Sequence, residues 1–367
     1  MLTVKILHGC HRGSLSHSLL HVALVTNIAQ FWCNVKSFGE RKDEKADFFA
    51  KKLDFASALW YSIEYKIYTI VWEVSELKLT DFLGKETLSL SFEVFPPKTD
   101  SAFESVRHAT EEIAKLSPAF MSVTYGAGGG TSRYTLEIAK NIKEQYGVPT
   151  VAHLTCVSST KETVREKIAE MKAAGIENVL ALRGDLTPEM EGKDRTGWAY
   201  CHATDLIRDL TSSGADFCIG GACYPEVHPE SKNQKEDILH LKEKVEAGCS
   251  FLTTQMFFDN NLFYNFLYKI REAGVLVPVL PGIMPITNGK QVERAIKLSG
   301  ALVPQRFKAL VDKFGENPAA MKQAGIAYAT DQIIDLFANG IHHVHVYSMN
   351  NPDVAAAILR NLSDILG

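Results

Sequence analysis

The segment Thr87–Thr99, TLSLSFEVFPPKT, guides the interpretation of the whole chain. Residues 88–94 are typical of a short buried strand. Pro96 and Pro97 end it, because proline has no N–H for a strand ladder and keeps the preceding residue out of a helix. Glu93 therefore lies where a strand opens into a loop. That edge carries the chemistry of α/β barrels and open α/β sheets, although an idle, solvated strand end would explain Glu93 equally well.

Beyond residue 86, apolar runs of strand length alternate with amphipathic stretches, the pattern of βα units around a parallel sheet. The predicted strands are 88–94, 119–124, 150–154, 178–182, 217–222, 251–254, 277–280 and 343–346. Helices are predicted near 102–116, 133–145, 161–174, 200–212, 235–247, 262–273, 289–298, 304–314, 318–338 and 352–366. Eight strands, each followed by a helix, predict an α/β fold of the (β/α)8 TIM barrel type. The glycine run at 126–130 lacks the G-x-G-x-x-G spacing of a dinucleotide-binding sheet, since Thr131 takes the last position.

Residues 1–76 differ from the rest of the chain, with no proline and no strand–helix alternation. We expect one of two explanations. Either this segment is an N-terminal extension to the catalytic barrel of residues 77–367, or the start is misassigned and translation begins near Leu77. The second explanation rests on Trp72-Glu73-Val74, whose codons resemble a purine-rich ribosome-binding sequence just upstream of Leu77.

The composition narrows the class of protein. With 46% hydrophobic and 22% charged residues, the chain is typical of folded globular proteins. A formal net charge of −4 gives no reason to expect a nucleic-acid or membrane partner. Seven cysteines without a C-x-x-C pair predict reduced cytoplasmic thiols rather than a disulfide framework or a zinc site. No metal site is expected at residues 342–345 either, because the histidines there alternate along a strand.

Polar side chains gather at the predicted carboxyl ends of the strands. They are Glu93, Thr124, Tyr125, His153, Thr155, Arg183, Gly184, Asp185, Tyr224, Glu226, His228, Gln255, Asp259 and Tyr347. Each alone has a structural explanation, but six of the eight strand ends carry ionisable or amide groups. Glu93 and Asp185 suit an acid and its electrostatic partner, and Arg183, Lys232 and Lys244 suit a phosphate or pyrophosphate. The residues alone indicate a barrel enzyme with a general acid and leave its substrate open.

Eight motifs follow one another between residues 86 and 350: SFEVFPPKT, SVTYGA, AHLTCV, ALRGDL, YPEVHPE, HLKEKVEAG, TTQMFFDN and PGIMPITN. In content and order they resemble the methylenetetrahydrofolate reductase family, in its short, flavin-dependent bacterial type. The resemblance implies a barrel that binds FAD at the strand ends and reduces 5,10-methylenetetrahydrofolate to 5-methyltetrahydrofolate. It further implies a ping-pong reaction in which NADH or NADPH reduces the flavin, serving one-carbon metabolism and methionine synthesis in the cytoplasm.

The resemblance also implies residue roles. Glu93 resembles the general acid that opens the folate ring, and Asp185 resembles the aspartate beside flavin and folate. Gln255 resembles the glutamine that binds the folate pterin, so these three are expected to contact substrate. The positions that match FAD contacts are Thr124, His153, Arg183, Gly184, Asp185, His202, Ala203, Asp237, His240 and Lys244.

Several positions depart from the family pattern. His202, His240 and Glu243 stand where other members carry tyrosine, asparagine and arginine. Ala295 replaces an aromatic residue that some members use at the nicotinamide and folate site, and Asn351 replaces an arginine. These departures leave the nicotinamide and folate contacts open.

Two alternatives therefore stand beside direct reduction by NAD(P)H. In the first, electrons reach the flavin through a partner subunit. In the second, the barrel binds flavin or folate without catalysis, against which the presence of Glu93, Asp185 and Gln255 argues. A homo-oligomer is expected in each case.

Overall fold

The computed structural model describes residues 78–125, 132–157, 159–186, 190 and 197–367. The chain divides into two compact units, Met1–Trp72 and Glu73–Gly367. All the described residues belong to the second unit. The predictions for residues 1–76 and for the glycine run at 126–130 therefore fall outside the described residues.

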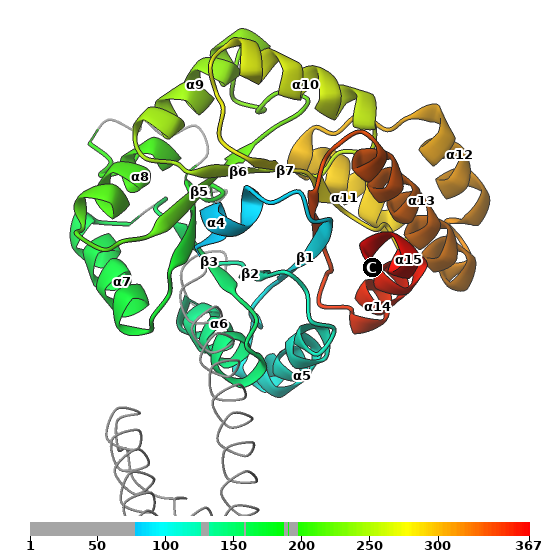
Figure 1. The fold of residues 1–367 in the computed structure, drawn as a ribbon, viewed down its shortest axis with the longest axis horizontal. Helices are drawn as coiled ribbons and strands as arrows, with labels where there is room; N and C mark the ends of the chain where they lie inside the picture. Colours follow the sequence, from blue (N-terminus) through cyan, green and yellow to red (C-terminus); the bar gives the residue numbers. More distant parts are fainter. Residues whose placement is uncertain (1–77, 126–131, 158, 187–189, 191–196) are drawn as a thin grey trace, which may run out of the picture. The chain divides into compact units, whose positions relative to one another are not determined.

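One parallel sheet forms the centre of this unit (Figure 1). Its strands are β1 (Ser89–Val94), β2 (Met121–Val123), β3 (Thr150–Thr155), β4 (Asn178–Leu182), β5 (Cys218–Cys223), β6 (Phe251–Thr254), β7 (Val279–Leu280), β8 (Gly282–Ile283) and β9 (His343–Tyr347). Neighbouring strands follow the order β7-β6-β5-β4-β3-β2-β1-β9-β8, and every pair is parallel. This arrangement confirms the predicted TIM barrel.

Pro281 divides the seventh barrel strand into β7 and β8. β7 pairs with β6, whereas β8 pairs with β9 on the other side. The Pro281 carbonyl accepts the His345 N–H at 2.9 Å, and the Gly282 N–H donates to Thr254 Oγ1 at 2.8 Å. Each half of the strand thus pairs with one neighbouring strand, β7 with β6 and β8 with β9. The predicted strand at 277–280 did not include the second half, because a proline ordinarily ends a strand.

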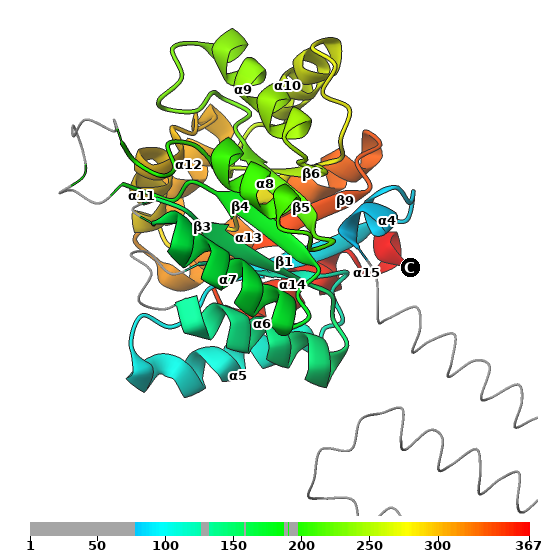
Figure 2. The same cartoon turned by 90° about the vertical axis from the view of Figure 1, so that its left-hand side faces the viewer.

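Helices surround the barrel (Figure 2). They are α5 (Phe103–Ala114), α6 (Ser132–Tyr146), α7 (Lys161–Ala173), α8 (Ala203–Ser212), α9 (Gln234–Glu246), α10 (Asn260–Glu272), α11 (Lys290–Ser299), α12 (Gln305–Phe314), α13 (Pro318–Ala338), α14 (Pro352–Asn361) and α15 (Ser363–Leu366), with a 3-10 turn, η1, at Asp100–Ala102. Asn351 caps α14, since its side chain accepts the Val354 N–H at 3.3 Å, and Pro352 follows in the first turn. No helix among the described residues is long and apolar enough to cross a membrane.

Strand residues alternate between the helices and the barrel interior. Phe92, Val94 and Met121 point outward and belong to the large core between sheet and helices. A smaller cluster fills the interior at the amino end: Leu79, Leu83, Phe120, Val151, Leu180, Cys218, Phe251 and Leu280.

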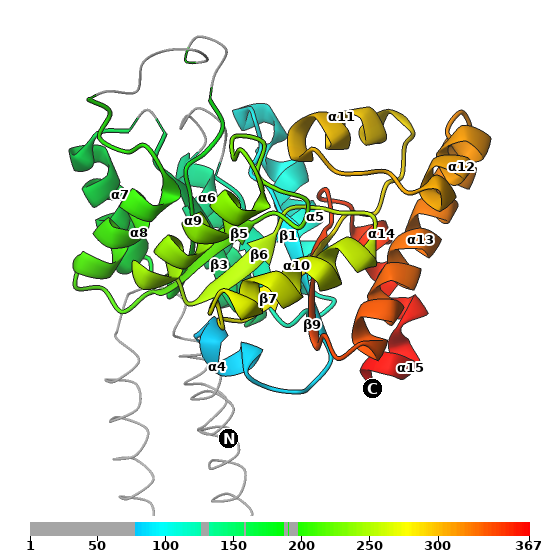
Figure 3. The same cartoon turned by 90° about the horizontal axis from the view of Figure 1, so that it is seen from above.

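A short helix that the sequence pattern did not predict, α4 (Leu79–Leu83), closes the amino end of the barrel. Its Leu79 N–H donates to Asn178 Oδ1 at 2.8 Å. Figure 3 shows α4 at one end of the barrel, with α11 near the other. The carboxyl ends of the strands are therefore the open end.

Candidate active site

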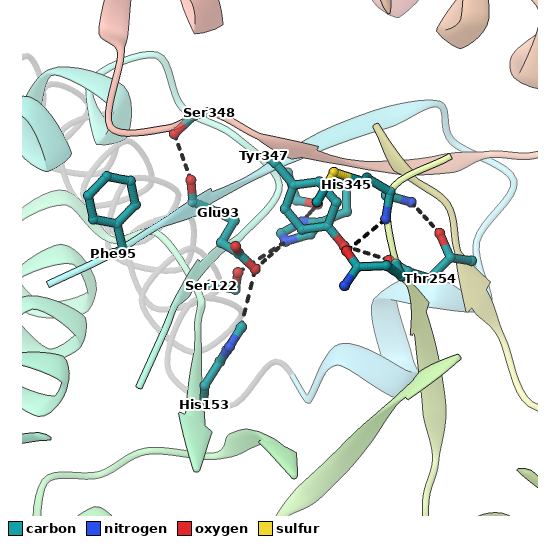
Figure 4. Close-up of polar contacts among 12 residues, drawn as sticks. Glu93, Phe95, Ser122, His153, Thr254, His345, Tyr347 and Ser348 are labelled. Carbon is teal, nitrogen blue, oxygen red and sulfur yellow. Dashed lines mark hydrogen bonds and ion pairs between the residues drawn. The ribbon is translucent and has the colours of Figure 1, made fainter. Parts of the chain in front are cut away.

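Glu93 points into the barrel from β1, one residue before the strand ends (Figure 4). It pairs in register with Ser122 of β2 and with Tyr347 of β9. Glu93 Oε2 lies 3.6 Å from His153 Nε2 and 4.0 Å from His345 Nε2, and the Ser122 hydroxyl hydrogen-bonds to the Glu93 carboxyl group. The Glu93 side chain remains 21% exposed, so it is shielded yet reachable from the open end.

The protonation states in this cluster follow from burial. Desolvation raises the pKa of Glu93 to about 8, with a smaller opposing effect from Ser122. Desolvation also lowers the pKa values of His153 and His345 to about 3. Both imidazoles are thus neutral at pH 7, and their approach to Glu93 is no ion pair. A carboxylic acid that keeps its proton near neutral pH is suited to general acid catalysis.

Two residues that follow β9 fasten the end of β1. Ser348 Oγ donates to the Glu93 main-chain carbonyl at 2.6 Å. The Asn350 side chain accepts the Phe95 N–H at 2.9 Å and donates to the Phe95 carbonyl at 2.8 Å. Asn350 has a φ of 53°, which asparagine tolerates better than most residues. These bonds replace a strand ladder where Pro96 begins, and they fix the backbone that carries Glu93.

Tyr347 crosses the barrel above the break in the seventh strand. Its hydroxyl donates to the Thr254 carbonyl at 2.5 Å. Burial raises the pKa of Tyr347 well above its usual value, and nearby Glu93 adds to this rise. A Cβ placed on Gly282 would lie 2.5 Å from the tyrosine oxygen, so only glycine fits beneath it.

Gln255 follows β6 directly, as predicted for a pterin-binding residue. Its N–H donates to the Cys223 carbonyl at 2.7 Å, and its side-chain oxygen accepts the Met256 N–H at 2.9 Å. The Gln255 side chain also hydrogen-bonds to Tyr224, whose pKa is raised by burial and by nearby Asp185. By contrast, Phe257 is buried in the large core between sheet and helices, and Phe258 is buried in a third cluster with Ala295 and Phe307, so neither ring offers a platform for a ligand.

Arg183, Gly184 and Asp185 follow β4. Arg183 forms an ion pair with Glu230 at 2.7 Å, whereas Asp185 is exposed. Gly184 has a φ of 92°, and a Cβ there would lie 2.9 Å from Val157 Cγ1. Only glycine therefore allows this backbone path.

The remaining predicted FAD positions lie mostly on neighbouring elements. Lys244 of α9 donates to the Ala222 carbonyl at 2.7 Å, and burial lowers its pKa. Asp237 accepts the His228 N–H at 3.1 Å and the Ser231 hydroxyl at 3.2 Å. These contacts hold the loop between β5 and α9.

Four further positions lie at the start of α8, within α9 or just after β2. Ala203 begins α8, and the ring of His202 before it lies 6.3 Å from the ring of His240. Thr124 instead follows β2, where its N–H donates to the Val94 carbonyl at 3.0 Å. The predicted residues therefore form one group beside Glu93 and a second group along β4, α8, β5 and α9.

The sequence profile described as methylenetetrahydrofolate reductase matches residues 78–363. The chain belongs to this family. A 5,10-methylenetetrahydrofolate reductase of Pectobacterium carotovorum subsp. carotovorum is 35% identical over 290 residues, covering 79% of this chain and 94% of that protein. The enzyme of the same name from Escherichia coli K12 is 34% identical over 275 residues, covering 75% and 90%.

Longer relatives match over part of their length. Methylenetetrahydrofolate reductase (NADH) 1 of Zea mays is 34% identical over 295 residues, which cover 78% of this chain and 50% of that protein. The chain thus spans about half the length of this plant relative. A solved structure from Clostridium thermocellum, an uncharacterized protein that binds two copies of 5-methyl-5,6,7,8-tetrahydrofolic acid, has a TM-score of 0.56 and 17% identity. It covers 79% of this chain and 99% of its own, and at that identity it supports the fold alone.

Membership of the methylenetetrahydrofolate reductase family indicates that activity and a place in folate-dependent one-carbon metabolism. Two hollows on the described surface lie elsewhere, one between α13 and α14 and one at the amino rim beside Pro278. The site at Glu93 is assigned from its chemistry and its place at the open end of the barrel.

Sequence reasoning did not propose two residues of this candidate site, Ser122 and His345. Both lie within their strands rather than at the last residue, and Ser122 Oγ is 3.0 Å from His345 Nε2. Strand alternation offered a signal: Ser122 precedes Thr124 by two residues, and His345 precedes Tyr347 by two, so each shares a face with a predicted rim residue.

Proposed function

We propose that this protein reduces 5,10-methylenetetrahydrofolate to 5-methyltetrahydrofolate by a ping-pong reaction, with Glu93 as general acid. The observation that carries the proposal is the buried Glu93 carboxyl group, whose pKa of about 8 keeps the proton in place at neutral pH. Its nearest titratable neighbours, His153 and His345, are neutral and do not compete for that role. Protonation of a ring nitrogen of the folate would open the five-membered ring and make its methylene carbon electrophilic.

FAD, when bound, would carry hydride from NADH or NADPH to the folate. The residues fit such a group. His153 Nε2 is buried and has no hydrogen-bond partner among the described residues, and Gly184 keeps the backbone close and free of a Cβ. Arg183 and Lys244 supply positive charge for a pyrophosphate, in exchange for their present contacts with Glu230 and the Ala222 carbonyl.

The other proposed roles follow from position. Gln255 and Tyr224 form a hydrogen-bonded pair at the mouth and would orient the pterin. Asp185 is exposed, close enough to Tyr224 to affect its pKa, and would face developing positive charge. Thr124, His202, Ala203, Asp237 and His240 complete the proposed FAD contacts. Oligomeric state stays a prediction.

Delivery of electrons by a partner subunit is the second candidate. One observation favours it. Ala295 is 2% exposed and packs with Phe258 and Phe307, so α11 offers no aromatic side chain to a nicotinamide at this position.

The Glu93→Gln variant tests the acid role. Glutamine keeps the size and hydrogen bonding of a protonated glutamate but has no proton to give. In anaerobic stopped-flow experiments we expect flavin reduction by NAD(P)H to change less than about twofold, while folate-dependent reoxidation falls about 10²–10⁴-fold. Equal loss of both half-reactions would remove Glu93 from the acid role.

A further inference from the structure

The end of β9 holds main-chain carbonyls of two other strands (Figure 4). The Tyr347 hydroxyl donates to the Thr254 carbonyl of β6 at 2.5 Å. The next residue, Ser348, donates through its Oγ to the Glu93 carbonyl of β1 at 2.6 Å. Gln255 follows Thr254 directly. Two adjacent residues thus contact the main chain at the proposed acid and just before the proposed pterin-binding residue.

The Thr254 carbonyl depends on Tyr347 because the seventh strand turns away at this point. β7 pairs with β6 as far as Leu280, and Pro281 then leads the chain to β9. The next main-chain donor, the Gly282 N–H, bonds to Thr254 Oγ1 at 2.8 Å instead of to the Thr254 carbonyl. Thr254 is buried, and a buried carbonyl needs a donor. The Tyr347 hydroxyl therefore takes the place of a ladder N–H at the end of β6.

One peptide plane is consequently fixed at both edges. It is the plane that joins Thr254 to Gln255. Its carbonyl accepts the Tyr347 hydroxyl, and its N–H donates to the Cys223 carbonyl of β5 at 2.7 Å. A peptide unit is planar, so two hydrogen bonds from different strands set its orientation. That orientation determines the direction in which the Gln255 side chain leaves the main chain.

The Tyr347 side chain has little freedom of its own. A Cβ on Gly282 would lie 2.6 Å from Tyr347 Cε2, so the ring packs directly against the glycine main chain. The ring of His345 lies 5.7 Å away, at an interplanar angle of 80°. Burial raises the pKa of Tyr347 well above its usual value, and the hydroxyl keeps its proton at neutral pH. Tyr347 is therefore a fixed donor to the main chain rather than a second acid beside Glu93.

We propose that Tyr347 is a positioning residue for Gln255: its hydroxyl fixes the Thr254 carbonyl and so aims the glutamine side chain at the pterin. Glu93 pairs in register with Tyr347, and Ser348 holds the Glu93 carbonyl. The end of β9 is thus a common support for the acid and the glutamine. This inference rests on the proposed function, in which Glu93 protonates the folate and Gln255 binds the pterin.

Tyr347→Phe removes the hydroxyl and keeps the ring. The measurement is reoxidation of the flavin by 5,10-methylenetetrahydrofolate in anaerobic stopped-flow experiments. The flavin of the full-length holoenzyme is first reduced with stoichiometric dithionite, so that no nicotinamide is needed. We expect the apparent Kd of the folate to rise about three- to tenfold, the effect of losing one buried hydrogen bond. An unchanged Kd would overturn the inference.

A double-mutant cycle with Gln255→Ala separates positioning from general damage. Without the glutamine side chain, Tyr347 has nothing to aim. In the Gln255→Ala background, Tyr347→Phe should therefore raise the Kd by less than about twofold. An undiminished effect in that background would also overturn the inference, because Tyr347 would then act on the folate by another route.

Tyr264→Phe is the matched control. The Tyr264 hydroxyl donates to Asp335 Oδ2 at 2.7 Å, between α10 and α13, so the variant loses a tyrosine hydrogen bond in the helical layer. We expect its folate Kd to match that of wild type, while urea denaturation reports the lost stability. An equal rise of the Kd in Tyr264→Phe and Tyr347→Phe would count against positioning, because the affinity would then follow stability.

Gly282→Ala tests the same hydrogen bond from below and serves if Tyr347→Phe does not fold. The added Cβ would lie 2.5 Å from the Tyr347 oxygen, so the hydroxyl must move from the Thr254 carbonyl. The folate Kd should rise in this variant too, and an unchanged value would contradict the inference. Failure of the proposed function would look different, because the reduced flavin of the wild-type protein would then not be reoxidised by the folate at all.

Discussion

At the scale of single residues, Glu93 owes its chemistry to what surrounds it. A carboxyl group beside a charged histidine would lose its proton at neutral pH, but His153 and His345 are too deeply buried to charge. Ser348 and Asn350 hydrogen-bond to the main chain at Glu93 and at Phe95. The acid is thus kept in position by main-chain contacts and kept protonated by desolvation.

This environment predicts how stability depends on pH. Glu93 has a pKa of about 8 in the folded protein against 4.5 for an ordinary glutamate. The folded state therefore holds more protons between these values, and its unfolding free energy falls as pH rises through about 8. Glu93→Gln cannot ionise, so its unfolding free energy does not fall in this way. The unfolding free energy of the variant minus that of wild type should therefore increase between about pH 5 and 9, by up to about 4 kcal/mol.

Urea denaturation at a series of pH values measures this difference. His153 and His345 have lowered pKa values, so they also reduce the unfolding free energy as pH falls below 6.5. This reduction is the same in wild type and in Glu93→Gln, and it cancels in the difference. Glu112→Gln on the surface of α5 is the control, because its pKa is lowered by Lys115 and it stays charged over this range. A flat difference for Glu93→Gln would contradict the raised pKa.

The site residues differ in how readily the sequence revealed them. Glu93 was proposed because two prolines mark the end of its strand, and His153 because it lies on a strand with a clear apolar pattern. Ser122 and His345 were missed as members of the site. A serine or histidine inside a strand has no local signal, and its meaning comes only from the strand beside it.

At the scale of elements, the broken seventh strand shapes the rim of the site. Tyr347 donates to the Thr254 carbonyl across this break, and Gly282 lies beneath it. The sequence pattern located β7 but not β8, because pairing of the second half with β9 is a long-range feature. Helix α4, which closes the amino end of the barrel, was not predicted for a similar reason. Its Leu79 and Leu83 are buried by residues of strands far along the chain.

Gly282→Ala should destabilise the protein. The added Cβ would lie 2.5 Å from the Tyr347 oxygen and 2.6 Å from the Thr254 carbonyl oxygen. Overpacking of this kind lowers the unfolding free energy by about 1–3 kcal/mol, measurable by urea denaturation. Gly84→Ala is the matched control, because a Cβ there meets only the Thr80 carbonyl at 3.8 Å. Equal stability of the two variants would argue against the tight contact beneath Tyr347.

At the scale of the whole molecule, periodicity was sufficient for the fold. The predicted strands and helices recur within a few residues of those in the structure, because outward strand faces and inward helix faces share one core. The eightfold alternation then implied closure. Periodicity does not show which polar side chains face one another inside the barrel. Prediction of the site therefore depended on the motifs, and its geometry on the register of the strands.

In the proposed function the acid, the pterin-binding pair and the flavin contacts all come from one chain, so direct reduction by a nicotinamide would need no second subunit. We expect purified protein to be yellow, and NADH or NADPH alone to bleach the flavin under anaerobic conditions. Stopped-flow absorbance with each donor separately measures this. Addition of 5,10-methylenetetrahydrofolate should then restore the colour.

The control is Glu93→Gln, in which NAD(P)H should still bleach the flavin but 5,10-methylenetetrahydrofolate should not restore its colour. A colourless protein that takes up no added FAD would contradict the flavin assignment. A yellow protein that neither donor bleaches would exclude direct reduction, and it would favour electron delivery by a partner. That outcome would also explain Ala295. This residue is a small side chain buried beside Phe258 and Phe307, so α11 has no aromatic group at this position for a nicotinamide.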